Sequence, residues 1–315
     1  MVQQGAHTDV RPNLFLVGAT KCGTSSWYTY LRTHPDIFFS PVKEPAHFCS
    51  DHPSDGRVTD RGEYLRLFKD AGSAKIVAEA STGHLFSEVA ARNIREYNPD
   101  AKIIIFVRDQ EGFLASRHNH MLFSGRENIA DFETAWRLSG KRDKSNMSPY
   151  CKRAETLDYR AAGEFSPQVE RYFAEFPSDQ IRVFHFNDWT RNPRRTYLDI
   201  MEFLGLEDDG RTSFERVNEA KHRKGKLIIR LIRQPPWPVV PLIQTFGIST
   251  RFRLTVRKWV SRLDTWRGSR TKLDERMKAE IHAYYKADND RLAPRIWTGS
   301  RPEAADPVST NVSAA

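Results

Sequence analysis

The sequence predicts an α/β fold in three layers, with a parallel central sheet flanked by helices. Short apolar runs recur along the chain with helical patterns between them, as in strand–helix–strand units whose strands run parallel. A glycine-rich turn follows the first run and leads into a helical pattern, which is the usual join at the carboxyl edge of such a sheet. The predicted strands are Leu14–Val17, Lys75–Ala78, Ile103–Val107 and Ile181–Phe186.

Each predicted element has a local reason. The run Ile103–Val107 is wholly apolar, which is typical of a parallel strand covered on both faces. After the glycine-rich turn, Trp27, Tyr28 and Leu31 keep helical spacing. An amphipathic helix is predicted near the C-terminus, where apolar residues recur at near-helical intervals: Leu273, Met277, Ile281, Tyr284 and Leu292.

Length and composition favour one large domain. The chain has 315 residues, of which 39% are hydrophobic and 28% charged, so it can bury a sizeable core. We expect a single domain over residues 13–300. The polar residues 1–12 are predicted to form a flexible tail, and the Pro-, Ala- and Ser-rich residues 301–315 a disordered one.

The turn after the first strand has the composition of a phosphate cradle. Gly18 and Gly23 have the spacing of the nucleoside-triphosphate loop G-x-x-x-x-G-K-[ST], so the predicted fold is P-loop-like. Thr24, however, stands where the lysine of that loop should be, and the lysine lies inside the turn, at Lys21. Free N–H groups and the positive dipole end of the following helix favour an anion there. We therefore expect a phosphate site that is not built to hydrolyse magnesium-bound ATP.

This variant, Lys21-Cys22-Gly23-Thr24-Ser25-Ser26, resembles the 5′-phosphosulfate loop of the sulfotransferases, which use 3′-phosphoadenosine 5′-phosphosulfate (PAPS). Three further matches follow in the family's order. They are Lys43-Glu44-Pro45-x-x-Phe48, the pair Arg108 and Ser116, and Phe203-Leu204-Gly205-Leu206 at the end of a later helix. The resemblance covers residues 13–300, and the chain looks like a bacterial-type member that is similar to the glycan and heparan-type sulfotransferases.

The resemblance implies a reaction and a set of cofactor contacts. A sulfuryl group would pass from PAPS to a hydroxyl, less readily an amine, of a glycan, glycolipid or small metabolite, leaving adenosine 3′,5′-bisphosphate. Lys21 would hold the 5′-phosphate and stabilise the leaving oxygen, and Arg108 would grip the 3′-phosphate with Ser116 as a second donor. Cys22, Gly23, Thr24, Ser25 and Ser26 would complete the cradle. No metal is implied.

These residues also have plainer interpretations. One of the three hydroxyls after Gly23 could simply cap the helix. Arg108 could form a salt bridge with Asp109 or Glu111. The family often has a proline two residues after the arginine, where this chain has Gln110, so we expect a different turn there.

Glu44 is the candidate general base. It lies between Pro41 and Pro45, in a segment where related glycan sulfotransferases place a catalytic glutamate, whereas other branches use histidine. A carboxylate there could accept the proton of a hydroxyl. The alternatives are an ion pair of Glu44 with Lys43 or Lys21, and a histidine base: His47, His118 or His120.

A basic run, Lys221-His222-Arg223-Lys224-Gly225-Lys226, comes later in the chain. Some sulfotransferases cover the nucleotide with a late basic loop, so Lys224 and Gly225 are candidate cofactor contacts; the alternative is a solvated charge run. Residues 227–270 mix cations with large apolar side chains. They predict a lid or a peripheral membrane contact, although such residues can also simply pack against the sheet.

Charge and cysteine content limit the partners and the compartment. The net charge of +9 suggests an anionic partner, but no zinc spacing, RNA-binding signature or basic repeat indicates nucleic acid. Three cysteines without C-x-x-C pairs favour a reducing compartment, and the N-terminus lacks a secretory pattern, so we expect a cytoplasmic protein. Two other functions stay open: a P-loop kinase, disfavoured by the displaced lysine and by the lack of a clear acidic metal-binding segment after a strand, and a non-catalytic nucleotide- or nucleic-acid-binding protein.

Overall fold

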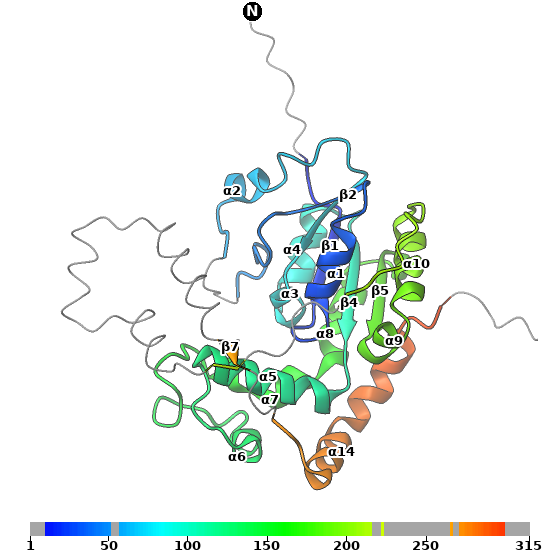
Figure 1. The fold of residues 1–315 in the computed structure, drawn as a ribbon. Helices are drawn as coiled ribbons and strands as arrows, with labels where there is room; N and C mark the ends of the chain where they lie inside the picture. Colours follow the sequence, from blue (N-terminus) through cyan, green and yellow to red (C-terminus); the bar gives the residue numbers. More distant parts are fainter. Residues whose placement is uncertain (1–9, 52–56, 216–221, 224–264, 267–270, 300–315) are drawn as a thin grey trace, which may run out of the picture.

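The computed structural model describes residues 10–51, 57–215, 222–223, 265–266 and 271–299. In this part of the chain, five parallel strands form one sheet in the order β2-β3-β1-β4-β5 (Figure 1). The first strand in sequence, β1, therefore lies in the centre, with β3 and β4 on either side. The strands are β1 (Leu14–Gly18), β2 (Ile37–Phe39), β3 (Ile76–Ala80), β4 (Lys102–Val107) and β5 (Ile181–His185).

The four predicted strands are present, with small changes at their ends, and the three-layer α/β fold is confirmed. The second strand begins one residue later than predicted and extends to Ala80, and the last ends at His185 because Phe186 begins a helix. The edge strand β2 was not predicted. Its three residues are too few to show a period that would distinguish a strand from a loop.

Helices connect the strands and lie on both sides of the sheet (Figure 1). The α-helices of the described residues are α1 (Thr24–Leu31), α2 (Arg61–Arg66), α3 (Gly83–Phe86), α4 (Ala90–Tyr97), α5 (Gln110–Ser124), α6 (Phe132–Arg137), α7 (Tyr159–Gly163), α8 (Phe165–Glu175), α9 (Phe186–Arg191), α10 (Pro193–Leu204) and α14 (Glu275–Leu292). Short 3₁₀ turns occur at η1 (Ala154–Leu157), η2 (Ser178–Gln180) and η3 (Ala293–Arg295).

The core is built from the apolar strands and the inward faces of the helices. Trp27 of α1 stacks on Phe106 of β4 with ring centroids 5.5 Å apart, and Phe106 in turn stacks on Phe184 of β5 at 5.6 Å. Because Trp27 is fully buried against Phe106 of β4, the strand beside β1, the start of α1 is fixed against the sheet. This contact sets the position of the glycine-rich loop that precedes the helix.

The C-terminal helix α14 confirms the predicted amphipathic pattern, with two corrections. Leu273 precedes the helix, which begins at Glu275. Met277, Ile281 and Leu292 are buried, and α14 packs against α8 and α5. Tyr284, which was predicted to face the core, is 45% exposed, and its neighbour Tyr285 is buried instead. The Tyr285 hydroxyl donates to the backbone carbonyl of Arg160, which gives its buried polar end a partner.

Several predictions fall on residues outside the described ranges. They concern most of the tail 1–12, the tail 301–315, Lys224 and Gly225, and nearly all of the segment 227–270. The short strands β6 (His222–Arg223) and β7 (Thr265–Trp266) form an antiparallel pair. Among the helices described, none is long and apolar enough to cross a membrane.

Candidate functional site

The loop from Gly18 to Gly23 leaves the carboxyl end of β1 and leads into α1. Its backbone has positive φ at Gly18 (152°), Lys21 (68°) and Gly23 (96°). The N–H of Ala19 donates to the Phe106 carbonyl over 2.5 Å, and that of Cys22 donates to the Ala19 carbonyl over 3.2 Å. The loop is therefore a tight turn anchored to β4. The N–H groups of Ser26 and Trp27 donate to the Gly23 carbonyl, whereas those of Thr24 and Ser25 come too early in α1 to have an acceptor within the helix.

Gly23 can only be glycine in this arrangement. A Cβ added there would lie 2.1 Å from Cζ2 of Trp189, and its φ of 96° disfavours a side chain. The Trp189 indole N–H also donates to the carbonyl of Cys22 over 3.4 Å. Trp189 of α9 thus covers the C-terminal half of the loop and fixes the backbone immediately before α1.

Lys21 is the cation of this loop, and its side chain stays exposed to solvent. Protein atoms around the ammonium partly desolvate it, and the Arg108 guanidinium repels it; both effects lower the pKa of Lys21 below its ordinary value. An anion between the two cations would offset this repulsion. The neighbouring Cys22 is buried, and burial raises the pKa of its thiol, so it fills space in the loop and is not a reactive thiolate.

Helix α1 begins directly after Gly23, which occupies the capping position without a side-chain cap. Thr24, Ser25 and Ser26 are therefore the first residues of the helix, and none of them is the N-cap that the plainer interpretation suggested. Thr24 and Ser26 are buried, whereas Ser25 is half-buried. The three residues bring N–H and hydroxyl groups to the positive end of the helix dipole.

Arg108 follows the last residue of β4, at the same edge of the sheet. Its guanidinium carbon lies 4.2 Å from the ring centroid of Phe186, the first residue of α9. Its Nε is buried and, among the described residues, has no hydrogen-bond acceptor; the Asp109 carboxylate is 3.6 Å away. The predicted ion pair with Asp109 is thus present, but it is too long to be a hydrogen bond. Ser116 lies in α5 and is half-buried.

Glu44 approaches this edge from the segment after β2. Its N–H donates to the Ala80 carbonyl at the end of β3 over 2.9 Å, and its φ is 64°. The Lys43 ammonium donates to Oε1 at 2.7 Å, so the predicted ion pair with Lys43 is formed. The backbone N–H of Thr82 donates to Oε2 at 2.7 Å, and the Thr82 hydroxyl lies 3.1 Å from both oxygens. The Glu44 side chain nevertheless remains 40% exposed.

Backbone strain is concentrated at this edge of the sheet. In the described part of the chain, the non-glycine residues with positive φ are Lys21, Glu44 and Ala46. Such a conformation costs about 1–2 kcal/mol per residue, and it persists where the surrounding structure imposes it, commonly at functional sites. Two of these three residues are those that the sequence motifs single out as the catalytic cation and base.

The rival histidines have packing partners. The His47 Nδ1 lies 2.8 Å from the Val58 carbonyl, and its ring stacks on Tyr64 at 4.3 Å. The ring nitrogens of the buried His118 lie 2.9 Å from the Ile129 carbonyl and 3.1 Å from the Thr271 hydroxyl. His120 lies in α5 and also has an interaction partner. Glu44 is thus more accessible than the buried His118, whereas His47 is half-buried, as Glu44 is, and is held by its contacts with Val58 and Tyr64.

A buried polar cluster that was not predicted lies near the Glu44 segment. Glu79 of β3 and His84 of α3 are fully buried, with Oε1 and Nδ1 3.2 Å apart. The Tyr64 hydroxyl donates to the other Glu79 oxygen at 2.6 Å. Burial raises the pKa of Glu79 to about 7 and lowers that of His84 to about 3, so both groups favour their neutral forms.

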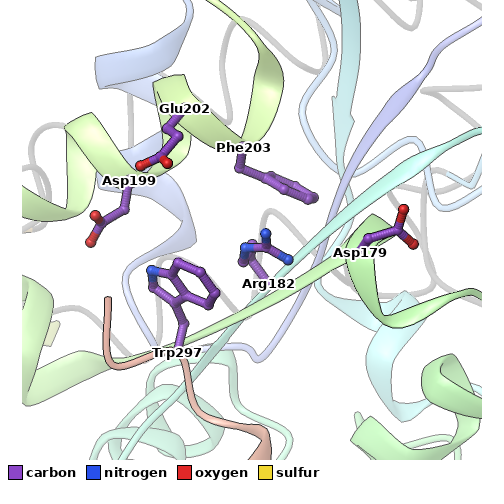
Figure 2. Close-up of a pocket in the computed structure, with 6 residues that line it drawn as sticks. All are labelled: Asp179, Arg182, Asp199, Glu202, Phe203 and Trp297. Atoms are coloured by element: carbon purple, nitrogen blue, oxygen red, sulfur yellow. The ribbon is translucent and has the colours of Figure 1, made fainter. Parts of the chain in front are cut away.

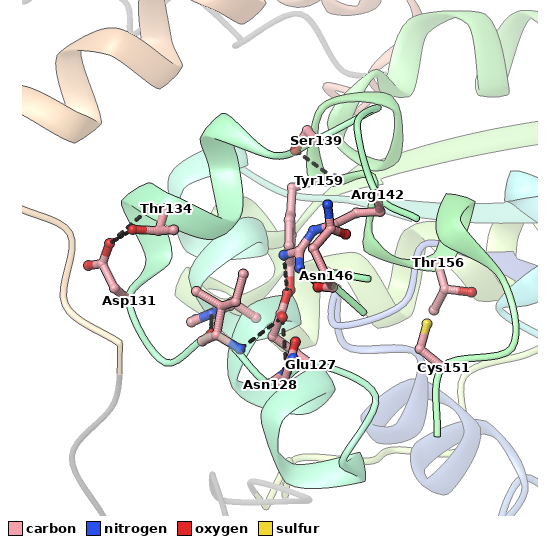
Figure 3. A network of polar contacts seen from close by, with 12 residues as sticks. Glu127, Asn128, Asp131, Thr134, Ser139, Arg142, Asn146, Cys151, Thr156 and Tyr159 are labelled. Atoms are coloured by element: carbon pink, nitrogen blue, oxygen red, sulfur yellow. Dashed lines mark hydrogen bonds and ion pairs between the residues drawn. The ribbon is translucent and has the colours of Figure 1, made fainter. Parts of the chain in front are cut away.

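A second network braces the segment that follows α5 (Figure 3). The buried Glu127 carboxylate accepts from Arg142 Nη2 at 2.7 Å, from the Tyr159 hydroxyl at 3.0 Å, and from the N–H groups of Asn128 and Ile129. These four donors all bind the Glu127 carboxylate, so this network is structural and fixes the chain between α5 and α7.

A hollow lies at the opposite end of β5, near the amino end of the sheet (Figure 2). Arg182 packs between Phe203 and Trp297, with its guanidinium carbon 4.6 Å and 4.2 Å from their ring centroids. Asp179, Asp199 and Glu202 complete the lining. The backbone N–H of Trp297 donates to the Val183 carbonyl over 2.7 Å, so these contacts anchor the chain after α14. They do not belong to the site at the carboxyl edge.

The geometry brings together most of the residues predicted for the site. The Gly18–Gly23 loop, Arg108 and Glu44 share the carboxyl edge of the sheet, whereas Lys224 and Gly225 lie outside the described residues. Among the described residues, no group of three or more His, Cys, Asp or Glu side chains is arranged to hold a metal ion. Trp189, Phe186 and Thr82 were not predicted; the one local sign was that aromatic residues follow directly after the β5 strand.

The family model for the sulfotransferase domain matches residues 11–224, which is more than half of the chain. The chain belongs to the sulfotransferase family. The match includes the Gly18–Gly23 loop, Glu44, Arg108 and Ser116. It confirms the family suggested by the sequence motifs.

Individual sulfotransferases support this assignment. The chain is similar to a solved sulfotransferase from Alicyclobacillus acidocaldarius, with 32% identity, a TM-score of 0.59, and coverage of 67% of this chain and 87% of that one. It is 24% identical over 256 residues to carbohydrate sulfotransferase 15 of Mus musculus, covering 64% of this chain and 46% of that protein. It is 24% identical over 203 residues to heparan sulfate glucosamine 3-O-sulfotransferase 3B1 of Mus musculus, covering 64% and 48%. The chain spans about half the length of these two relatives.

Proposed function

We propose that this sulfotransferase moves a sulfuryl group from PAPS to a hydroxyl of a glycan, with Glu44 as general base and Lys21 stabilising the leaving phosphate. One observation carries the proposal. Lys21 and Glu44, singled out by separate sequence motifs, are both held at positive φ, in two segments that meet at the carboxyl edge of the sheet. Strain of this kind is tolerated where a precise geometry is needed.

The residues at this edge suit the anionic groups of PAPS. The Gly18–Gly23 loop and the first turn of α1 offer N–H groups and hydroxyls to the 5′-phosphosulfate. Arg108 has a buried Nε without an acceptor among the described residues, which suits a charged partner such as the 3′-phosphate. Asp109 N-caps α5 by accepting from the Gly112 N–H, so it orients the helix that carries Ser116.

The proposed transfer step follows from these positions. The acceptor hydroxyl gives its proton to the Glu44 carboxylate while its oxygen forms a bond to sulfur. The bond between sulfur and the bridging oxygen of the 5′-phosphate breaks, and the electron pair leaves with adenosine 3′,5′-bisphosphate. The charge that grows on the leaving oxygen is stabilised by the Lys21 ammonium and by the N–H groups of the loop.

Lys43 supports Glu44 from the other side. The Lys43 side chain is 25% exposed, and its ammonium pairs with Oε1, so it helps to hold the carboxylate in place. The acceptor class is inferred from the relatives, whose names specify carbohydrate and heparan sulfate substrates. One relative is named as a 3-O-sulfotransferase. Another, bifunctional heparan sulfate N-deacetylase/N-sulfotransferase 2 of Homo sapiens, is 24% identical over 203 residues, covering 63% of this chain and 22% of that protein. A glycan hydroxyl is therefore the main proposal and a glycan amine the second.

Two measurements test the proposal. Calorimetry should show tight binding of adenosine 3′,5′-bisphosphate without Mg²⁺ and weak binding of magnesium-bound ATP, which separates a sulfotransferase from a P-loop kinase. Incubation with [³⁵S]PAPS and a pool of heparan, chondroitin and neutral oligosaccharides should then label the glycans. Preference for magnesium-bound ATP, or no label in the pool, would contradict the proposal.

A further inference from the structure

We propose that Thr82 is a positioning residue that couples the phosphate loop to the Glu44 carboxylate. This inference rests on the proposed function of Glu44. Thr82 lies between the end of β3 and the start of α3. Its hydroxyl is 3.1 Å from the Thr20 hydroxyl of the loop and 3.1 Å from both oxygens of Glu44. It is therefore a direct link between the two segments that are proposed to carry the chemistry.

The Thr82 hydroxyl does not cap helix α3, although Thr82 occupies its N-cap position. Thr82 is the N-cap residue of α3, where a threonine hydroxyl usually accepts an N–H from the first helical turn. No such side-chain cap is formed here, and the N-cap backbone has helical rather than extended dihedrals, with φ −69° and ψ −17°. The side chain is instead directed toward Thr20 and Glu44.

The number of protons fixes the direction of the hydrogen bonds. A hydroxyl has one proton to donate, and an ionised carboxylate can only accept. The Thr82 proton therefore goes to Glu44, and the Thr82 oxygen accepts the proton of Thr20. The result is a directional chain from Thr20 through Thr82 to Glu44, in which each donor is polarised by the next acceptor.

The Glu44 carboxylate has one acceptor direction left after these contacts. Its two oxygens offer about four lone-pair directions. Among the described residues, three donors are in place: the Lys43 ammonium, the Thr82 N–H and the Thr82 hydroxyl. The remaining direction, on a side chain that is 40% exposed, is available to the hydroxyl of an acceptor. Thr82 supplies two of the three donors, so it sets the rotation of the carboxylate.

The backbone around Thr82 is fixed on both sides, so the link is rigid. A Cβ added at Gly18 would lie 2.6 Å from Leu85 Cβ and 3.2 Å from the Thr82 carbonyl, which shows how closely α3 approaches the loop. The Ser81 N–H donates to the Leu16 carbonyl, and the Ser81 hydroxyl accepts from the Ala46 N–H. A change at Thr20 is therefore transmitted to Glu44 through groups that cannot easily relax.

Removal of the Thr82 hydroxyl should change the orientation of the base. The carboxylate would keep Lys43 and the Thr82 N–H as donors and could rotate toward Lys43, away from the acceptor. The Thr82 N–H would remain, which distinguishes this effect from general disruption of the turn.

The chain offers a closely matched control. Thr134, in the first turn of α6, also donates both its N–H (2.8 Å) and its hydroxyl (2.6 Å) to one carboxylate oxygen, that of Asp131 (Figure 3). Neither Thr134 nor Asp131 belongs to the site. Thr134→Val therefore removes the same type of hydrogen bond from the same type of carboxylate, without touching the proposed chemistry.

The test compares Thr82→Val, Thr82→Ser, Thr20→Val and Thr134→Val for transfer from [³⁵S]PAPS to the glycan pool. Thr82→Val should lower kcat about 10- to 100-fold, with unchanged affinity for adenosine 3′,5′-bisphosphate. Thr82→Ser should restore kcat. Thr20→Val should give a smaller loss in the same direction, and Thr134→Val should match the wild type.

The outcomes separate this inference from the proposed function. If the wild type labels glycans and Thr82→Val keeps its kcat, the role of Thr82 is wrong and the proposed function stands. The same holds if Thr82→Ser fails to restore activity while folding normally. If Thr82→Val does not fold, the kcat and nucleotide affinity of Thr20→Val decide, since that change breaks the link from the partly exposed loop. If the wild type labels nothing in the pool, both proposals fail.

Discussion

The six-membered ring of the Trp189 indole abuts the position of Gly23, which leaves no room for even one side-chain carbon: a Cβ there would come within 2.1 Å of the ring. This contact joins the first residue before α1 to the helix that follows β5. It explains why the loop ends in glycine, and it places an aromatic cover beside the phosphate cradle. The same helix begins with Phe186, over which the Arg108 guanidinium lies at 4.2 Å.

The first prediction concerns this contact. Gly23→Ala should destabilise the protein by about 2–5 kcal/mol, because overpacking against Trp189 adds to the strain of positive φ. Gly72→Ala is the matched control, since Gly72 also has positive φ but has no atom within 4 Å of an added Cβ; it should lose only about 1–2 kcal/mol. Denaturant unfolding measures both. Equal losses would contradict the assigned contact.

The second prediction concerns Arg108 and nucleotide choice. The wild type should bind adenosine 3′,5′-bisphosphate more tightly than adenosine 5′-phosphate by about 1.5–3 kcal/mol, the range for hydrogen bonds to charged groups. In Arg108→Gln, this difference should largely disappear, because the guanidinium is lost while the 5′-phosphate site remains. Calorimetry gives both affinities. A difference that persists in the variant would assign the 3′-phosphate to another group.

The third prediction concerns Lys21. Lys21→Ala should reduce turnover by about 10²–10³ at saturating PAPS and weaken nucleotide binding much less, because the charge on the leaving oxygen grows toward the transition state. Arg108→Gln should raise the pKa of Lys21, since the Arg108 guanidinium is one cause of its lowering. Single-turnover rates and NMR titration of the lysine test these two statements. An unchanged turnover would remove Lys21 from the chemistry.

The fourth prediction concerns the buried Glu79. Its pKa is raised to about 7, so the folded state binds more protons than the unfolded state above the ordinary pKa of a glutamate. This group therefore destabilises the fold progressively as the pH rises from about 4.5 to about 7. The pKa of His84 is lowered to about 3, so this group stabilises the fold progressively as the pH rises from about 3 to about 6.5. The contributions of Glu79 and His84 to the pH dependence of stability therefore nearly cancel in the wild type around pH 5–6.

Replacement of Glu79 by glutamine removes its pH-dependent contribution to stability and leaves that of His84. The unfolding free energy of Glu79→Gln, relative to the wild type, should increase with pH between about 4.5 and 7 by a few kcal/mol, since a pKa change of one corresponds to about 1.4 kcal/mol. Glu88→Gln, at an exposed position, should show no such trend. Urea unfolding at several pH values measures the difference. A pH-independent difference would mean that Glu79 is not held in its neutral form.

The strands and the glycine-rich loop could be predicted because their signals are local. Apolar runs of four to six residues reveal buried parallel strands, and the spacing of Gly18, Lys21 and Gly23 is contained within one turn. The edge strand β2 was missed because it has only three residues. Tyr284 was placed on the wrong face of α14 because aromatic neighbours at 284 and 285 both suit an apolar stripe.

The supporting residues of the site could not be predicted, since their contacts join distant segments. Trp189 is 166 positions from Gly23, and Thr82 is 38 from Glu44; no local pattern relates either pair. Nor does composition reveal that Glu79 is buried beside His84. These positions follow from the order of strands in the sheet, which brings the ends of β1, β3, β4 and β5 to one edge.

The most direct test of Glu44 as general base is the rate of sulfuryl transfer by Glu44→Gln at saturating [³⁵S]PAPS. Glutamine can adopt the same backbone conformation but cannot take up the proton, so transfer should slow by about 10²–10⁴ while the affinity for adenosine 3′,5′-bisphosphate is kept. His47→Ala, His118→Ala and His120→Ala serve as comparisons, each expected to retain far more activity once folded. A near-native rate for Glu44→Gln, with transfer lost in one folded histidine variant, would contradict the assignment and make that histidine the base.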